Sequence, residues 1–149
     1  MIDAFKYVIA KGIETEKAYP YKAQAEKCRA DPAKFVFHIK GYNKVAPLDN
    51  PQLQAAVDQQ PVSIGVDAES LQFYKKGIIS TGCGQNVDHA VLLVGYGADA
   101  GKDFWKVKNS WGQAWGELGY FRVLRKTGTN QRSQCGVNLE ASYPTGGSK

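Results

Sequence analysis

One histidine and one asparagine in this sequence are placed so that they can form a proton-transfer pair. His89 lies near the start of the apolar stretch VDHAVLLVGYG, residues 87–97, and Asn109 ends WKVKN, residues 105–109. An asparagine carbonyl that accepts one ring N–H fixes the histidine tautomer and leaves the other ring nitrogen free to take a proton. This arrangement is a base and its orienting partner in nucleophilic acyl transfer. From spacing alone, a histidine held in a structural polar network remains the alternative.

A hairpin is the element that would bring this pair together. The two apolar stretches predict antiparallel strands that turn near residues 98–101, so that paired residues have numbers adding up to about 198. His89 then lies opposite Asn109, with Cβ atoms about 4.5–5.5 Å apart, within reach of a hydrogen bond between imidazole and amide. A bulge at Gly95 or Gly97 would shift this register by one residue.

The other predicted elements are short, and strands dominate the second half of the chain. Asn50 is predicted to cap a helix whose first residue is Pro51, and Gly41 to separate two strands. We expect helical segments at 2–11, from 51 onward and at 71–74, and strands at 35–39, 42–45, 62–66, 89–96, 104–108 and 120–124.

Composition and charge exclude several classes of function. The 149 residues are 43% hydrophobic and 22% charged, which is typical of one globular domain with its own core. The net charge is +5, but the basic residues are scattered, so we expect no nucleic-acid partner. No apolar run is long enough for a membrane-spanning helix, so we expect no membrane partner. The first residues contain charges and no cleavage site, so they do not resemble a signal peptide.

The cysteines argue against a metal centre. Cys28, Cys83 and Cys135 form no C-x-x-C pair, so the usual spacing of metal ligands is missing and we expect neither a metal nor another cofactor. Two of the three could form a structural disulfide, which would require an oxidising compartment. The third is then a free thiol or has a partner outside this chain.

Three stretches carry a resemblance to a known family. VDHAVLLVGYG, FWKVKNSWGQAWGELGYFRV and CGVNLEASYPT closely resemble the papain-like cysteine proteases, which include cathepsin L, and MIDAFKYVIAKGIETEKAYPY resembles the same family's helix and Tyr-Pro-Tyr loop. The resemblance covers essentially the whole chain. It implies an α+β fold, with a remnant of the helical first domain and the crossover at residues 1–40 and the antiparallel, barrel-like second domain at residues 41–149.

The resemblance also implies roles for individual residues. His89 matches the general base and Asn109 the residue that orients it. Trp111 matches an indole that shields their hydrogen bond from water, and exclusion of water strengthens such a bond. Asp88 lies beside the base and could tune its charge, or is simply solvated. Trp115 matches an indole on the leaving-group side of the substrate cleft, with core packing as the alternative.

A specificity pocket follows from the same resemblance. The positions that match its lining are Met1, Gly65, Val87, Ala90 and Glu140. A carboxylate at the bottom of an apolar pocket could pair with an arginine side chain and turn to solvent otherwise. We therefore expect the complete enzyme to accept both bulky apolar residues and arginine there, with a solvent-facing glutamate as the alternative.

The family's nucleophile has no match in this sequence. It lies in a C-G-S-C-W stretch roughly 130–150 residues before the histidine, whereas only 88 residues precede His89. The resemblance therefore implies the C-terminal two-thirds of a mature enzyme, and a chain that is inactive alone. It pairs Cys83 with Cys135 and gives Cys28 a partner in the upstream segment.

The implied partners are peptide or protein substrates, and the upstream segment if it is a separate chain. The implied location is lysosomal, vacuolar or secreted. Two alternatives stay open. One is a non-catalytic protease homologue that binds peptides or inhibitors without cutting them. The other is an unrelated β-barrel binding module in which His89 and Asn109 are structural.

Overall fold

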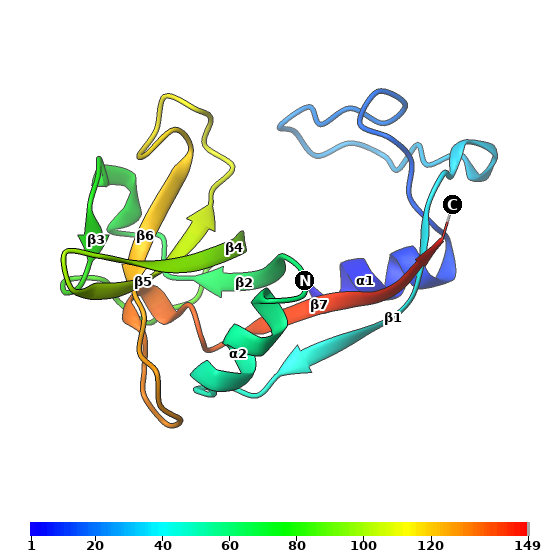
Figure 1. Cartoon of the computed structure of the whole chain (residues 1–149). Helices are drawn as coiled ribbons and strands as arrows, with labels where there is room; N and C mark the ends of the chain where they lie inside the picture. Colours follow the sequence, from blue (N-terminus) through cyan, green and yellow to red (C-terminus); the bar gives the residue numbers. More distant parts are fainter. Residues whose placement is uncertain (149) are drawn as a thin grey trace. The chain divides into compact units, whose positions relative to one another are not determined.

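The computed structural model describes residues 1–148 as a mixed α+β chain, which confirms the predicted fold class (Figure 1). Two helices and seven strands follow one another in this part of the chain, with three short 3-10 turns between them. Their bounds are α1 Ile2–Ala10, η1 Pro32–Lys34, β1 His38–Val45, α2 Asn50–Val57, β2 Val62–Val66, η2 Leu71–Phe73, β3 Ile78–Ile79, β4 His89–Asp99, β5 Lys102–Lys108, β6 Tyr120–Leu124, η3 Gln134–Gly136 and β7 Ala141–Ser148. No helix among the described residues is both long and apolar enough to cross a membrane.

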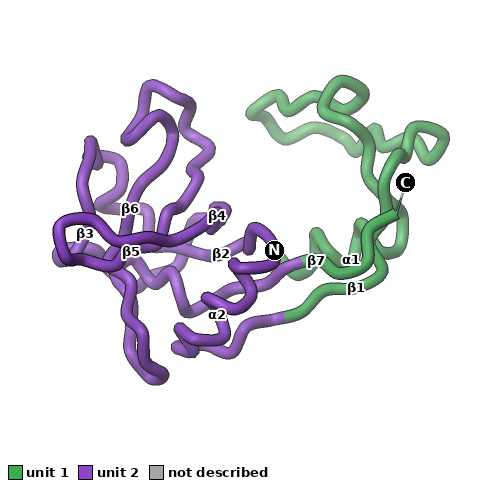
Figure 2. Tube along the Cα trace, viewed as in Figure 1, with its two compact units in different colours: residues 1–43, 144–149 green, residues 44–143 purple. Residues whose placement is uncertain are grey.

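The chain divides into two compact units (Figure 2). The first comprises Met1–Asn43 and the C-terminal residues from Pro144, and the second comprises Lys44–Tyr143. Within the first unit, α1 has no fully buried residue, although the ring of Phe5 stacks on Tyr42 with centroids 5.8 Å apart.

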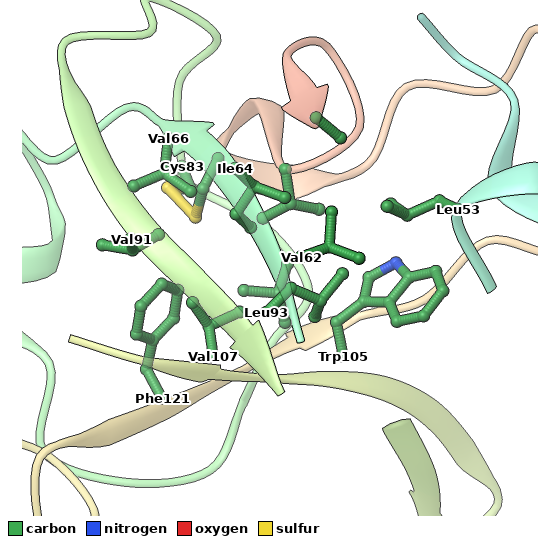
Figure 3. Packing of buried hydrophobic residues seen from close by; sticks show 14 of the residues in the cluster. Leu53, Val62, Ile64, Val66, Cys83, Val91, Leu93, Trp105, Val107 and Phe121 are labelled. Atoms are coloured by element: carbon green, nitrogen blue, oxygen red, sulfur yellow. A yellow bond between two sulfur atoms is a disulfide. The ribbon is translucent and has the colours of Figure 1, made fainter. Parts of the chain in front are cut away.

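One mostly antiparallel sheet contains all seven strands, and the five strands β2 to β6 lie in the second unit with most of the core. The strand order is β1-β7-β2-β4-β5-β6-β3, antiparallel from β7 through β6, while the two-residue β3 runs parallel to β6. Apolar side chains from β2, β4, β5 and β6 alternate inward, as a half-buried strand requires. Figure 3 shows these side chains together with Leu53 of α2 and the disulfide of Cys83.

The predicted hairpin forms, but its register differs by two or three residues. Leu93 pairs with Val107, and Tyr96 pairs with Trp105, so that paired numbers add up to 200 and then 201, with a bulge between Leu93 and Gly95. The cause is a tighter turn than expected. Ala100 and Gly101 have φ values of 49° and 74°, which is the two-residue turn whose twist suits adjacent strands.

Two other local predictions were wrong. Asp49, not Asn50, caps α2, because its side chain accepts the N–H of Gln52 at 2.9 Å. Asn50 is the first residue of the helix instead, and its side chain is buried. Gly41 does not separate two strands, because β1 runs through it. A Cβ at this position would lie 3.0 Å from the hydroxyl of Thr145, so the glycine permits the close approach of the Thr145 side chain.

Candidate active site

The structure brings His89 and Asn109 together, with Nε2 of the imidazole 2.9 Å from Oδ1 of the amide. His89 is the first residue of β4. Asn109 lies one residue past the end of β5, where its backbone N–H donates to Gly119 O at 2.9 Å. The contact therefore joins a strand residue to a loop residue. The contact forms although the register of the hairpin differs from the predicted one.

The orientation of the amide follows from its second contact. The backbone N–H of Ser110 points at Oδ1 of Asn109 from 2.8 Å, and only an oxygen can accept it. The same oxygen must then accept from Nε2 of His89, so the neutral imidazole carries its proton on Nε2 and leaves the Nδ1 lone pair available. Nδ2 of Asn109 is buried and has no hydrogen-bond partner among residues 1–148.

Two indoles pack beside this pair. The ring of Trp111 stacks on the imidazole of His89, with centroids 5.2 Å apart and planes 27° from parallel. Trp115 meets Trp111 edge to face at 5.0 Å and donates its Nε1–H to Leu71 O at 3.2 Å. Asn109 is only 7% exposed, so its hydrogen bond to His89 lies largely out of bulk water.

Asp88 points its carboxylate elsewhere. Its Oδ1 accepts the backbone N–H of Ala68 at 2.9 Å, and its own N–H donates to Val66 O at 3.1 Å. Asp88 thus ties the start of β4 to the segment after β2.

Four of the five predicted pocket residues come together in the second unit. Gly65 pairs with Ala90 across β2 and β4, and its N–H donates to Glu140 O at 2.9 Å. A Cβ added at Gly65 would collide with Val87 and lie 3.6 Å from Oε2 of Glu140. The absence of a side chain at Gly65 therefore permits the close approach of Val87, with the Glu140 carboxylate beside it. Met1, the fifth residue, belongs to the first unit and is 36% exposed.

The cysteines are paired as the resemblance implied. Cys83 and Cys135 form a disulfide across a sequence separation of 52 residues, which stabilises the fold by about 4 kcal/mol in the chain-entropy model. Cys28 is a free, exposed thiol in the first unit, at a cavity of about 320 Å³ that none of the predicted site residues lines. Within residues 1–148 no group of three or more His, Cys, Asp or Glu side chains is placed to hold a metal ion.

One part of the site was not anticipated from the sequence. Glu117 and Arg122 form a two-pronged ion pair at 2.8 and 2.9 Å, next to Tyr74, whose ring packs on Trp115. Hydrogen bonds from Arg122 hold the pKa of Glu117 below its usual value, and Glu117 in turn raises the pKa of Arg122. Two opposite charges five residues apart around the turn glycine Gly119 were the available signal in the sequence.

The comparisons with known proteins agree with this fold. The family model described as papain family cysteine protease matches residues 1–145. The oryzain beta chain of Oryza sativa subsp. japonica is 46% identical over 150 residues, covering 97% of this chain and 32% of its own length. The germination-specific cysteine protease 1 of Arabidopsis thaliana is 42% identical, covering 95% of this chain and 39% of its own.

Solved structures give the same result. Bromelain protease from Ananas comosus, in complex with the E64 inhibitor, superposes with a TM-score of 0.90 at 38% identity, covering 97% of this chain and 68% of that one. Digestive procathepsin L 3 from the larval midgut of Tenebrio molitor gives 0.89 at 44%, covering 97% and 48%. The chain therefore belongs to the papain family of cysteine proteases, and it spans about a third to under half of the length of the rice and Arabidopsis relatives.

Proposed function

We propose that this chain carries the base and the orienting residue of a papain-like thiol endopeptidase, with His89 as the base and Asn109 as its partner. The observation that carries the proposal is the 2.9 Å contact between Nε2 of His89 and Oδ1 of Asn109, which leaves Nδ1 free. Trp111 supports it by covering one face of the imidazole. The nucleophilic cysteine would come from residues that this sequence does not contain.

In the proposed chemistry Nδ1 of His89 acts as a base twice, first for the cysteine thiol and later for water. Nδ1 takes the proton of the cysteine thiol, and the thiolate attacks the carbonyl carbon of the peptide bond. Nδ1–H then gives that proton to the departing amine as the carbon–nitrogen bond breaks, leaving a thioester. Water, deprotonated by the same nitrogen, hydrolyses the thioester and restores the thiol. Asn109 keeps the imidazole in place while its charge changes, because its carbonyl accepts from Nε2–H in both protonation states.

The test is a chimera in which this chain replaces the matched region of the Oryza sativa oryzain beta chain. We expect the chimera to cleave a peptide substrate in a reaction that thiol reagents block, and His89→Ala to abolish cleavage. His38→Ala is the matched control, because His38 lies in the first unit and should leave activity unchanged. The isolated 149-residue chain should be inactive. Thiol-dependent cleavage by it, or full activity of the His89→Ala chimera, would contradict the proposal.

We propose that Gly65, Val87, Ala90 and Glu140 line the pocket that selects the substrate residue second before the cleaved bond; Met1 is included on the resemblance alone. Support comes from the grouping of Val87 and the Glu140 carboxylate next to Gly65, where a Cβ on the glycine would lie 3.6 Å from Oε2 of Glu140. The chimera should accept both phenylalanine and arginine at this substrate position, and Glu140→Gln should weaken cleavage after arginine-containing dipeptides while sparing the phenylalanine ones. Complete rejection of arginine by the unmodified chimera would refute this.

The same proposal covers partners and location. The partners would be peptide or protein substrates and the segment that carries the nucleophile. A lysosomal, vacuolar or secreted location fits the Cys83–Cys135 disulfide, because such bonds persist in oxidising compartments.

A further inference from the structure

Residues 109–119, which we call the tryptophan loop, form a closed unit. Asn109 N–H donates to Gly119 O at 2.9 Å, Gly119 N–H to Trp115 O at 2.8 Å, and Trp115 N–H to Gly112 O at 3.4 Å. The loop thus carries the orienting asparagine at its beginning and both indoles within it. A displacement near residue 117 would be transmitted to the two indoles, because these backbone hydrogen bonds connect the last residues of the loop to Trp115 and to Asn109.

A continuous series of ring contacts leads from the far side of this loop to the imidazole. His89 stacks on Trp111 at 5.2 Å, and Trp111 meets Trp115 at 5.0 Å. Trp115 in turn packs against Tyr74 at 5.6 Å and against Phe121 at 5.8 Å. Offset and edge-to-face aromatic contacts of this kind prefer defined geometries, so the rings hold one another in place.

An ion pair fastens the end of the tryptophan loop. Nε and Nη2 of Arg122 donate to the two carboxylate oxygens of Glu117, and Nη1 donates to Asp99 at 2.7 Å. Glu117 also accepts the N–H of Gly77 at 2.8 Å. The side chains of Arg122 and Glu117 are 20% and 26% exposed, and a partly buried two-pronged pair constrains geometry more than a surface pair does.

Tyr74 joins the ion pair to the ring contacts. Its hydroxyl donates to Gly77 O at 2.7 Å and accepts the backbone N–H of Arg122 at 3.3 Å, while its ring packs on Trp115. The same few residues therefore fix both the charged end of the loop and the indole that supports Trp111.

We propose that Glu117 and Arg122 are positioning residues that hold the indole of Trp111 against the imidazole of His89. They act through Trp115 and Tyr74 and touch neither the imidazole nor the proposed substrate. The proposal rests on the proposed function only in its catalytic consequence; the geometric claim concerns this chain alone and is tested without any activity.

The test compares Glu117→Ala with Asp103→Ala in the 149-residue chain. Asp103 is the matched control, because its carboxylate also forms an ion pair with an arginine, Arg125 at 3.0 Å, but Asp103 lies in β5, outside the tryptophan loop. Proton NMR reports the contact through the nuclear Overhauser effect between the His89 and Trp111 rings, and through the ring-current shift of the His89 carbon-bound protons. Trp111→Ala gives the signals of an uncovered imidazole, and His38 is the internal reference.

Glu117→Ala should lose the Overhauser effect and move the His89 signals to the values of Trp111→Ala, while Asp103→Ala should leave them unchanged. If both variants only lower the melting temperature and leave the His89 signals in place, the ion pair is purely structural and the proposal is overturned. If Glu117→Ala does not fold, Glu117→Gln, which keeps the volume and one acceptor oxygen, is judged by the same criterion. The nitrogen shifts of His89 in Asn109→Ala separately test the proposed function.

Discussion

Two buried asparagines of the second unit show how differently one residue type is used. Asn50 is 1% exposed and makes four hydrogen bonds: its Nδ2 donates to the carbonyls of Gly128 and Gln131, and its Oδ1 accepts from Ser133 and Asn138. Asn109 is 7% exposed, and of its two side-chain polar atoms only Oδ1 has a hydrogen-bond partner within the described chain.

The difference separates a polar group that stabilises the fold from one that belongs to the proposed site. A buried polar network is stabilising when every member is paired, and Asn50 ties α2 to the segment that leads to Cys135. The Asn109 contact leaves its own buried Nδ2 without a partner among residues 1–148, which costs stability, and leaves Nδ1 of His89 available as a proton acceptor. Substitutions at the two positions should therefore affect different properties.

Asn50→Ala should reduce stability more than any of the other substitutions. It would remove all four of these hydrogen bonds at a buried position. The hydroxyl of Ser133 and the carbonyl of Gly128 would lose their Asn50 partner, whereas Nδ2 of Asn138 and Gln131 O would still bond to each other at 2.7 Å. We therefore expect a loss of about 3 kcal/mol in the free energy of unfolding. Urea denaturation measures it, with Gln59→Ala, at an exposed position in the turn after α2, as the control. A loss no larger than that of the control would contradict the comparison, because the hydrogen bonds of Asn50 would then not stabilise the fold.

Tyr74→Phe tests whether a second fully paired polar group behaves like Asn50. Removing the hydroxyl leaves Gly77 O and Arg122 N–H unpaired, so we expect a loss of about 1–2 kcal/mol. Burial also raises the pKa of Tyr74 to about 12 from the ordinary value of 10.0. The unfolded chain therefore ionises first, and the stability from the protonated hydroxyl is present below pH 10 and lost as the pH rises to about 12.

The measurement for Tyr74 is the free energy of unfolding at several alkaline pH values. Tyr74→Phe should show a smaller loss between pH 10 and 12 than the unmodified chain, because it lacks this hydroxyl. Tyr21→Phe, at a position that is 84% exposed, is the control and should keep the full loss. Equal alkaline slopes in all three proteins would show that Tyr74 does not contribute.

Asn109→Ala should cost less stability and change the site more. We expect a loss of about 1 kcal/mol, since Nδ2 has no partner in the described chain to lose and the other contacts lie beside the partly exposed imidazole of His89. The nitrogen chemical shifts of that imidazole should show a mixture of both neutral tautomers instead of the Nε2–H form. A loss as large as that of Asn50→Ala, with an unchanged tautomer, would place both asparagines in the same structural class.

The sequence predicted the contact between His89 and Asn109 better than it predicted the register of the hairpin that carries it. Periodicity is local, so the bounds of β2 and β6 were predicted correctly, and the proximity of His89 to Asn109 followed from the hairpin. The register was wrong because the two-residue turn at Ala100 and a bulge depend on backbone angles that periodicity does not contain.

The role of Asn50 was missed for a different reason. Its partners lie 78 to 88 residues away along the chain, and no local pattern connects positions that far apart. A helix-capping residue type beside a proline favoured Asn50 as the cap, whereas Asp49 takes that place and frees the asparagine for the interior. The role proposed for the Glu117–Arg122 pair was also missed. It depends on the contacts of Tyr74 with Arg122 and Trp115, which the five-residue spacing of the two charges does not show.

Asp88→Asn should have the smallest effect, although Asp88 precedes the proposed base directly. The amide keeps an oxygen that can accept from Ala68 N–H and removes only the charge, so we expect the free energy of unfolding to change by less than about 0.5 kcal/mol. The nitrogen shifts of His89 should also remain those of the unmodified chain, because the Asp88 carboxylate is engaged with the backbone. Asp88→Ala is the companion variant, and it should lose more stability since it removes the acceptor. A changed His89 tautomer in Asp88→Asn would show instead that this charge tunes the base, and the site would then extend beyond His89 and Asn109.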